Sequence, residues 1–111
     1  MSAGITISWV EADRPWATWI AFQVRELGYS VHLEYRAGSN RVHEFDRMLE
    51  EGYRVFAVVS DASLADEVTR SEWLRAVHRD PTGERGLVAP LLVRPGDAGP
   101  LSPLTPVRLY D

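Results

Sequence analysis

The sequence predicts an α/β domain with a flavodoxin-like, doubly wound open parallel sheet of about five strands. Short β-branched and aromatic runs alternate along the chain with segments whose apolar residues recur at helical spacing. One run, residues 55–59, is almost wholly apolar, which is typical of a strand buried on both faces at the centre of a parallel sheet. The length of 111 residues suits one domain with one core.

The first elements follow from local signals. Residues 5–10 are β-branched and aromatic, and we interpret them as a strand. Asp13 is a candidate helix cap, and Pro15 suits a first helical turn. Apolar residues then recur at helical spacing as far as Gly28. Residues 29–35 alternate between apolar and polar side chains, which predicts a second, less hydrophobic strand.

The middle of the chain contains two more predicted helices. Residues 36–40 have turn chemistry and should form a loop, after which residues 42–49 are amphipathic and should form a helix that ends near Gly52. The third strand, residues 55–59, comes next. Residues 60–70 are polar and irregular and are predicted to be a loop, with Ser71 capping a short helix.

The last third of the chain is predicted to contain two strands and no further helix. Residues 87–93 read as a strand, in which Pro90 indicates an edge position or a local irregularity. The proline-rich and glycine-rich residues 94–106 should form an extended loop. Residues 106–110 then read as the fifth strand.

Composition excludes several classes of function. The net charge is −4 without a basic run, so we predict no nucleic-acid partner. There is no cysteine, which excludes a disulfide framework and a thiolate nucleophile and fits a reducing compartment. The chain shows no signal peptide or membrane segment and no GxGxxG or Walker motif. Its histidines, His32, His43 and His78, do not cluster. We therefore predict a cytoplasmic protein without a metal or a resident cofactor.

Several blocks occur in an order that resembles a Toll/interleukin-1 receptor (TIR) domain. They are Ile7–Trp9, a glycine-containing loop after the second strand, Phe56–Ser60 and Ser71–Trp73. The chain looks most like bacterial TIR domains of actinobacterial proteins that carry nucleotide-binding and tetratricopeptide-like regions, whose first helix also begins like Asp13–Trp16. The resemblance covers residues 1–111. It implies a signalling or effector domain in bacterial immunity that associates with other TIR domains.

The resemblance also implies a candidate catalytic residue. Many TIR domains hydrolyse NAD at the nicotinamide–ribose bond, with a glutamate at the start of a helix, and that position falls on Glu72. A carboxylate there stabilises the positive charge that develops on the ribose. The plainer interpretation is that Glu72 is a first-turn acid stabilised by the helix N-terminus. Both interpretations stay open at this stage.

Four further residues are candidates for contact with NAD, which would be a substrate and not a cofactor. Trp9 would stack on a ring, Arg36 would hold the diphosphate, Gly38 would let the loop approach closely, and Ser60 follows the central strand. Each also has a structural interpretation. Trp9 suits a core aromatic, Arg36 a solvated side chain, and Gly38 and Ser60 turn residues.

Three departures from the family pattern leave the function divided between two hypotheses. Val68 stands where family enzymes often carry a tryptophan, Glu34 replaces an aspartate, and the loop after the second strand is short. The first hypothesis is an NAD glycohydrolase that acts when assembled. The second is a non-catalytic adaptor for homotypic interaction. Because family members continue into a last helix, we also expect this chain to be the N-terminal part of a longer protein or to lack that helix.

Overall fold

The computed structural model describes residues 4–34 and 40–109. Its strands are β1 (Ile5–Ser8), β2 (Val31–His32), β3 (Arg54–Val59), β4 (Val88–Leu92) and β5 (Val107–Arg108). Its helices are α1 (Arg14–Glu26), α2 (Arg41–Glu50), α3 (Asp61–Ala65) and α4 (Glu67–Arg79), with short 3₁₀ turns η1 (Glu11–Asp13) and η2 (Gly99–Leu101).

The strands form one parallel sheet in the order β2-β1-β3-β4-β5. The apolar strand β3 lies at its centre, between β1 and β4, as predicted. This is the strand order of a flavodoxin-like doubly wound sheet, in which ligands bind beyond the carboxyl ends of the strands near the switch in order. The predicted fold class is therefore confirmed.

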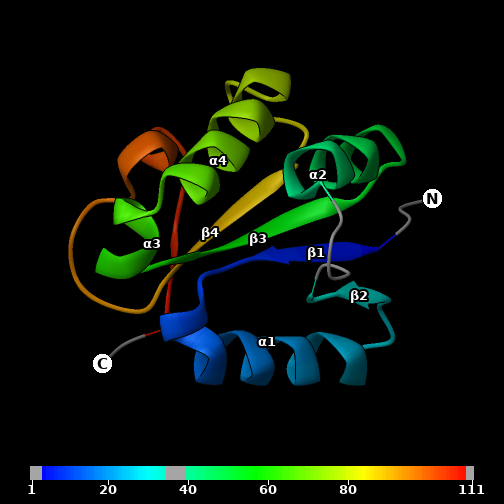
Figure 1. Cartoon of the computed structure of the whole chain (residues 1–111), viewed down its shortest axis with the longest axis horizontal. Helices are drawn as coiled ribbons and strands as arrows, with labels where there is room; N and C mark the ends of the chain where they lie inside the picture. Colours follow the sequence, from blue (N-terminus) through cyan, green and yellow to red (C-terminus); the bar gives the residue numbers. More distant parts are fainter. Residues whose placement is uncertain (1–3, 35–39, 110–111) are drawn as a thin grey trace.

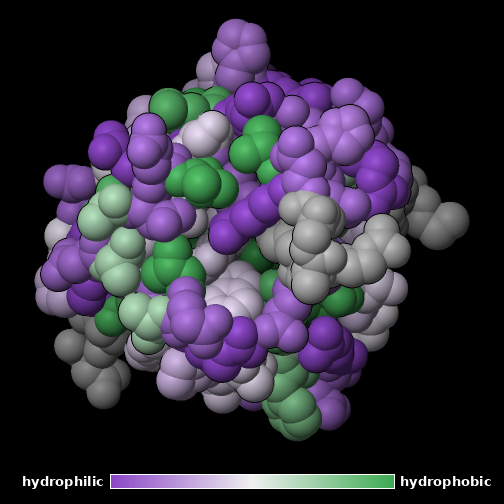
Figure 2. Space-filling model, viewed as in Figure 1, coloured by the Kyte–Doolittle hydropathy of each residue, from purple (hydrophilic) through white to green (hydrophobic). Residues whose placement is uncertain are grey.

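Helices cover both faces of the sheet (Figure 1). Helix α1 packs on one face, where Ile5, Ile7 and Ile20 are buried in one core cluster. Helices α2 and α4 pack on the other face, where Phe45 and Trp73 belong to a second cluster. Because side chains alternate along a strand, β1 turns its isoleucines towards α1 and its polar residues towards α2 and α4. The outer surface in this view is mostly hydrophilic, with separate hydrophobic patches (Figure 2).

The segment after β3 corrects one prediction. Residues 60–70 are not an irregular loop, because α3 and the first turn of α4 together occupy most of them. Ser60 caps α3 in a reciprocal arrangement: its hydroxyl accepts from the Ser63 amide, and the Ser63 hydroxyl accepts from the Ser60 amide. This capping box satisfies backbone donors that a free helix end leaves unpaired. With this cap, a segment of only five residues forms a helix, which packs Leu64 against the core.

The start of α4 corrects a second prediction. Asp66, and not Ser71, is the N-cap, because its carboxylate accepts from the Thr69 amide and hydroxyl at 2.9 and 2.7 Å. The helix therefore begins at Glu67, five residues earlier than a helix capped by Ser71 would. Glu72 lies in the second turn and is not a first-turn acid, so the helix N-terminus does not explain its presence.

The prediction that Pro90 marks an edge strand is wrong. It lies inside β4, between β3 and β5, and is paired in register with Ala57. The carbonyl of Leu92 accepts from the amide of Leu109, which directly follows β5, so by alternation the nitrogen of Pro90 also points to that side. Strand β5 begins only at Val107, opposite Leu91. The missing N–H therefore removes no bond from the ladder.

Element ends differ in detail from the predictions. Strand β1 ends at Ser8, because the chain leaves the sheet before the η1 turn, and β2 contains only two paired residues. The loop predicted for residues 94–106 includes the short η2 turn. Among the described residues, no helix combines the length and the apolar character needed to span a lipid bilayer.

Candidate functional site

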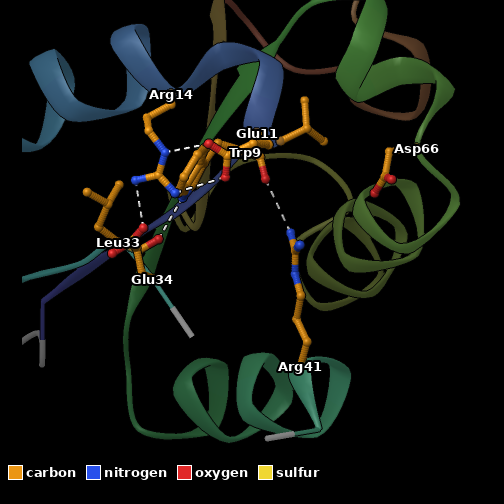
Figure 3. Close-up of a pocket in the computed structure, with 8 residues that line it drawn as sticks. Trp9, Glu11, Arg14, Leu33, Glu34, Arg41 and Asp66 are labelled. Atoms are coloured by element: carbon orange, nitrogen blue, oxygen red, sulfur yellow. Dashed lines mark hydrogen bonds and ion pairs between the residues drawn. The ribbon is translucent and has the colours of Figure 1, made fainter. Parts of the chain in front are cut away.

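A pocket of about 350 Å³ lies beyond the carboxyl ends of β1 and β2, on the edge of the sheet where the fold class predicts a ligand (Figure 3). Its volume is at the lower end of the range for small-molecule sites. The lining residues are Trp9, Val10, Glu11, Arg14, Leu33, Glu34, Arg41 and Asp66.

Trp9 forms the aromatic wall of the pocket. It directly follows β1, and its indole Nε1 donates to the carbonyl oxygen of Leu33 at 2.6 Å, which ties together the chain segments after β1 and β2. The guanidinium carbon of Arg14 lies 4.7 Å from the centroid of the ring. This separation is that of a cation–π contact. The ring is therefore fixed from two sides.

The rim of the pocket contains a small ion-pair network. Arg14, the first residue of α1, contacts Glu11 at 2.5 Å and Glu34 at 2.7 Å. The hydrogen bonds that Arg14 donates to Glu11 and to Glu34 raise the pKa of its guanidinium, and the hydrogen bond from Arg14 lowers the pKa of Glu11. Because these groups are solvent-exposed, the network contributes more to shape and charge than to stability.

Glu72 lies behind this pocket and is fully buried, with 0% of its side chain exposed. Arg41 binds it through two atoms: Nε donates to Oε2 at 2.8 Å and Nη2 donates to Oε1 at 3.0 Å. The hydroxyl of Ser8 also donates to Oε1, at 3.1 Å, and itself accepts from Nε1 of Trp73 at 2.9 Å. The carboxylate is thus held by a charge partner and an ordered hydrogen-bond chain.

Arg41 stands between the pocket and Glu72. It is the first residue of α2, its side chain is 32% exposed, and it lines the pocket while pairing with the buried carboxylate. Its Nη2 also approaches the carbonyl oxygen of Trp9 at 3.4 Å, a contact visible in Figure 3. Glu72 itself is not among the lining residues. One guanidinium therefore separates the predicted catalytic carboxylate from the pocket.

Three helices begin at this pocket. Arg14 opens α1, Arg41 opens α2, and Asp66 caps α4, and all three residues line the cavity. The positive ends of these helix dipoles thus face the same volume. Asp66 responds to this setting, since hydrogen bonds from the hydroxyl and the amide of Thr69 lower its pKa. The partial positive charge of these helix ends partly compensates the negative charge of the carboxylates that line the pocket.

The predicted site residues do not all come together. Trp9 lines the pocket and Glu72 lies directly behind it. Ser60 is elsewhere: it is buried, caps α3, and donates a hydrogen bond to the carboxylate of Asp13. Arg36 and Gly38 fall outside the described residues. Among the residues that are described, no group of three or more histidines or acids is arranged to hold a metal ion.

Sequence reasoning missed the residues that connect Trp9 with Glu72. Arg41 was not singled out, although it opens a predicted helix at the sheet edge where a ligand was expected. Ser8 was read only as part of a motif, and Arg14 only as part of a helix start. Their roles depend on partners far along the chain, because Arg41 and Ser8 meet Glu72 across 31 and 64 residues.

Comparisons with known proteins agree with this architecture. The crystal structure of the TIR domain of the Toll-related receptor TRR-2, from the lower metazoan Hydra magnipapillata, is similar with a TM-score of 0.74 and 16% sequence identity. The match covers 95% of this chain and 82% of that one. No curated protein shows significant similarity to the chain. The family model for TIR domains matches residues 5–111, and the chain therefore belongs to the TIR domain family.

Proposed function

We propose that this TIR domain assembles with other TIR domains and, in the assembled form, hydrolyses NAD at the nicotinamide–ribose bond. The observation that carries this proposal is the place of Glu72, directly behind a pocket at the carboxyl ends of the strands and one side chain away from it. A carboxylate at that depth is close enough to act on a ligand once Arg41 moves. TIR domains in general interact with one another.

The proposed reaction needs one carboxylate and water. The bond between the nicotinamide nitrogen and the ribose carbon breaks, and both electrons leave with nicotinamide, which becomes neutral. Glu72 stabilises the positive charge on the ribose. Water then adds its oxygen to that carbon and releases a proton, which gives ADP-ribose. A volume of about 350 Å³ fits the nicotinamide–ribose end better than the whole dinucleotide.

The second candidate function is that of a non-catalytic adaptor. The observation in its favour is that Arg41 and Ser8 together satisfy both carboxylate oxygens of Glu72 in the single chain. Such a buried pair also suits a purely structural role. Val68 stands at the place where family enzymes often carry a tryptophan. It is aliphatic and 42% exposed, so it supplies no aromatic wall to the pocket.

Incubation of the concentrated protein with NAD, with nicotinamide measured over time, separates these functions. We expect nicotinamide release from the natural chain and its loss in Glu72→Gln. Glu67→Gln is the matched control, because it removes the same charge from an exposed position on the same helix. Equal release from the natural chain and Glu72→Gln would refute the role of Glu72. Absence of release at every protein concentration would leave the adaptor as the function.

Self-association is proposed to involve α1. Trp19 and Phe22 are adjacent on the outward side of this helix and are 51% and 57% exposed. Exposed aromatic residues of this kind often mark an interface. Sedimentation should show concentration-dependent association that Phe22→Ser weakens.

We assign the domain to the bacterial type and to the cytoplasm. The absence of cysteine fits the reducing environment of that compartment.

A further inference from the structure

We propose that Arg41 is the anion-binding residue of the pocket, and that a phosphate group of the ligand takes its guanidinium away from Glu72. Anion binding and release of the carboxylate are then coupled. The dinucleotide identity of the ligand rests on the proposed function, but the exchange itself rests on the contacts of Arg41.

The geometry of Arg41 suits phosphate binding. Arg41 holds Glu72 with two N–H groups in the planar arrangement that arginine also uses for phosphate. Glu72 is fully buried, whereas the Arg41 side chain is 32% exposed and lines the cavity. A ligand in the cavity therefore meets the guanidinium before it meets the carboxylate.

The charges and helix ends around Arg41 also favour a bound anion. Arg41 is the first residue of α2, where the helix dipole disfavours a cation and favours an anion. A phosphate beside Arg41 would gain from this helix end, whereas the start of α4 already holds the carboxylate of Asp66. The nearby acids Glu11 and Glu34 are already paired with Arg14, which weakens their repulsion of an anion.

The exchange must also leave the charges around Glu72 balanced. Glu72 keeps its hydrogen bond from Ser8 but loses its cationic partner, and a buried carboxylate without a counter-charge is strongly disfavoured. NAD carries both charges that are needed, since its diphosphate pairs with Arg41 and its positively charged nicotinamide end takes the place beside Glu72. A ligand with the anion alone supplies no cation in place of Arg41 and should bind more weakly.

Calorimetric binding of ADP-ribose tests this exchange without catalysis, because ADP-ribose lacks the bond that the proposed reaction breaks. Glu72→Gln removes the competing charge, and we expect it to bind ADP-ribose about 5- to 150-fold more tightly than the natural chain, the usual range of coupling between sites. Arg41→Met should bind at least about tenfold more weakly than Arg41→Lys, which keeps the charge. Arg47→Met, an exposed arginine of the same helix, is the control and should bind normally.

A second readout reports the state of Glu72 directly. The indole N–H of Trp73 is fully buried and linked to Glu72 through Ser8, so its NMR signal should shift when ADP-ribose saturates the natural chain. The signal of Trp19 on the outer side of α1 should stay in place. Equal affinity of Glu72→Gln and the natural chain, or an unmoved Trp73 signal at saturation, would overturn the proposal. Neither result depends on nicotinamide release, so the proposed hydrolysis and this exchange fail separately.

Discussion

Replacement of Arg41 by methionine should destabilise the domain strongly, because it leaves a buried charge without its partner. Glu72 has no exposed surface and would lose both hydrogen bonds and the positive charge that Arg41 supplies. Breaking a buried ion pair from one side costs about 3–5 kcal/mol. Arg41 itself is 32% exposed, so water reaches the vacated place and the lower part of this range is expected. A loss of about 3 kcal/mol is a large part of the stability of a small domain.

Urea unfolding at pH 7 measures this loss. With a slope of about 1–3 kcal/mol per molar urea, the midpoint should fall by roughly 1–3 M. Arg47→Met is the matched control: Arg47 pairs with Glu44 and Glu51 on the exposed side of α2, so its loss should be under about 1 kcal/mol.

The double variant Arg41→Met with Glu72→Met separates charge from packing. Two methionines fill the space without any buried charge, and an apolar replacement of a buried ion pair is often neutral or stabilising. We therefore expect the double variant to recover most of the stability that Arg41→Met loses. If Arg41→Met unfolds at the same urea concentration as Arg47→Met, the inference that Arg41 neutralises a buried carboxylate is wrong.

Three smaller changes test other parts of the structure. Asp66→Ala removes the cap of α4 and should lower the free energy of unfolding by about 1 kcal/mol at pH 7. Asp80→Ala should also be destabilising, because the amide of Leu87 donates to Asp80 and lowers its pKa. Both carboxylates have lowered pKa values in the folded state, so their contribution is complete above the unfolded pKa and disappears as the pH falls through the folded one. The difference between the urea midpoints of natural and variant chains should therefore shrink as the pH falls below the ordinary aspartate pKa of about 4, and a difference that does not change below that pH would contradict this account. Ser8→Ala leaves the buried indole N–H of Trp73 without its acceptor, and thermal unfolding should show a loss of about 1–3 kcal/mol, whereas Ser8→Thr should retain part of it.

The fold follows from local patterns in the sequence. Residues 55–59 are apolar on both sides, which places them at the centre of a sheet, and alternation with amphipathic segments requires parallel crossovers. These signals are strong because each depends only on near neighbours in the chain. The helix at residues 61–65 was missed because its stability comes from a capping box and not from an apolar stripe. The residues of this capping box, Ser60 and Ser63, are also typical of a turn.

The candidate site was only partly predictable. Position in the family pattern pointed to Glu72, and an aromatic after the first strand pointed to Trp9. Nothing in the sequence shows that Arg41 pairs with Glu72 or that Ser8 links Glu72 to Trp73. These contacts join residues on three elements that touch only when α2 and α4 pack on the same face of the sheet.

The sequence by itself therefore determined the order of the strands along the chain, the helices α1, α2 and α4, and the edge of the sheet where a ligand would bind. Tertiary structure alone decided that Glu72 is buried, that Arg41 covers it, and that three helix ends face one cavity. The physical reason is that hydrophobic periodicity is a property of neighbouring residues, whereas charge pairing depends on the distance between side chains from separate elements.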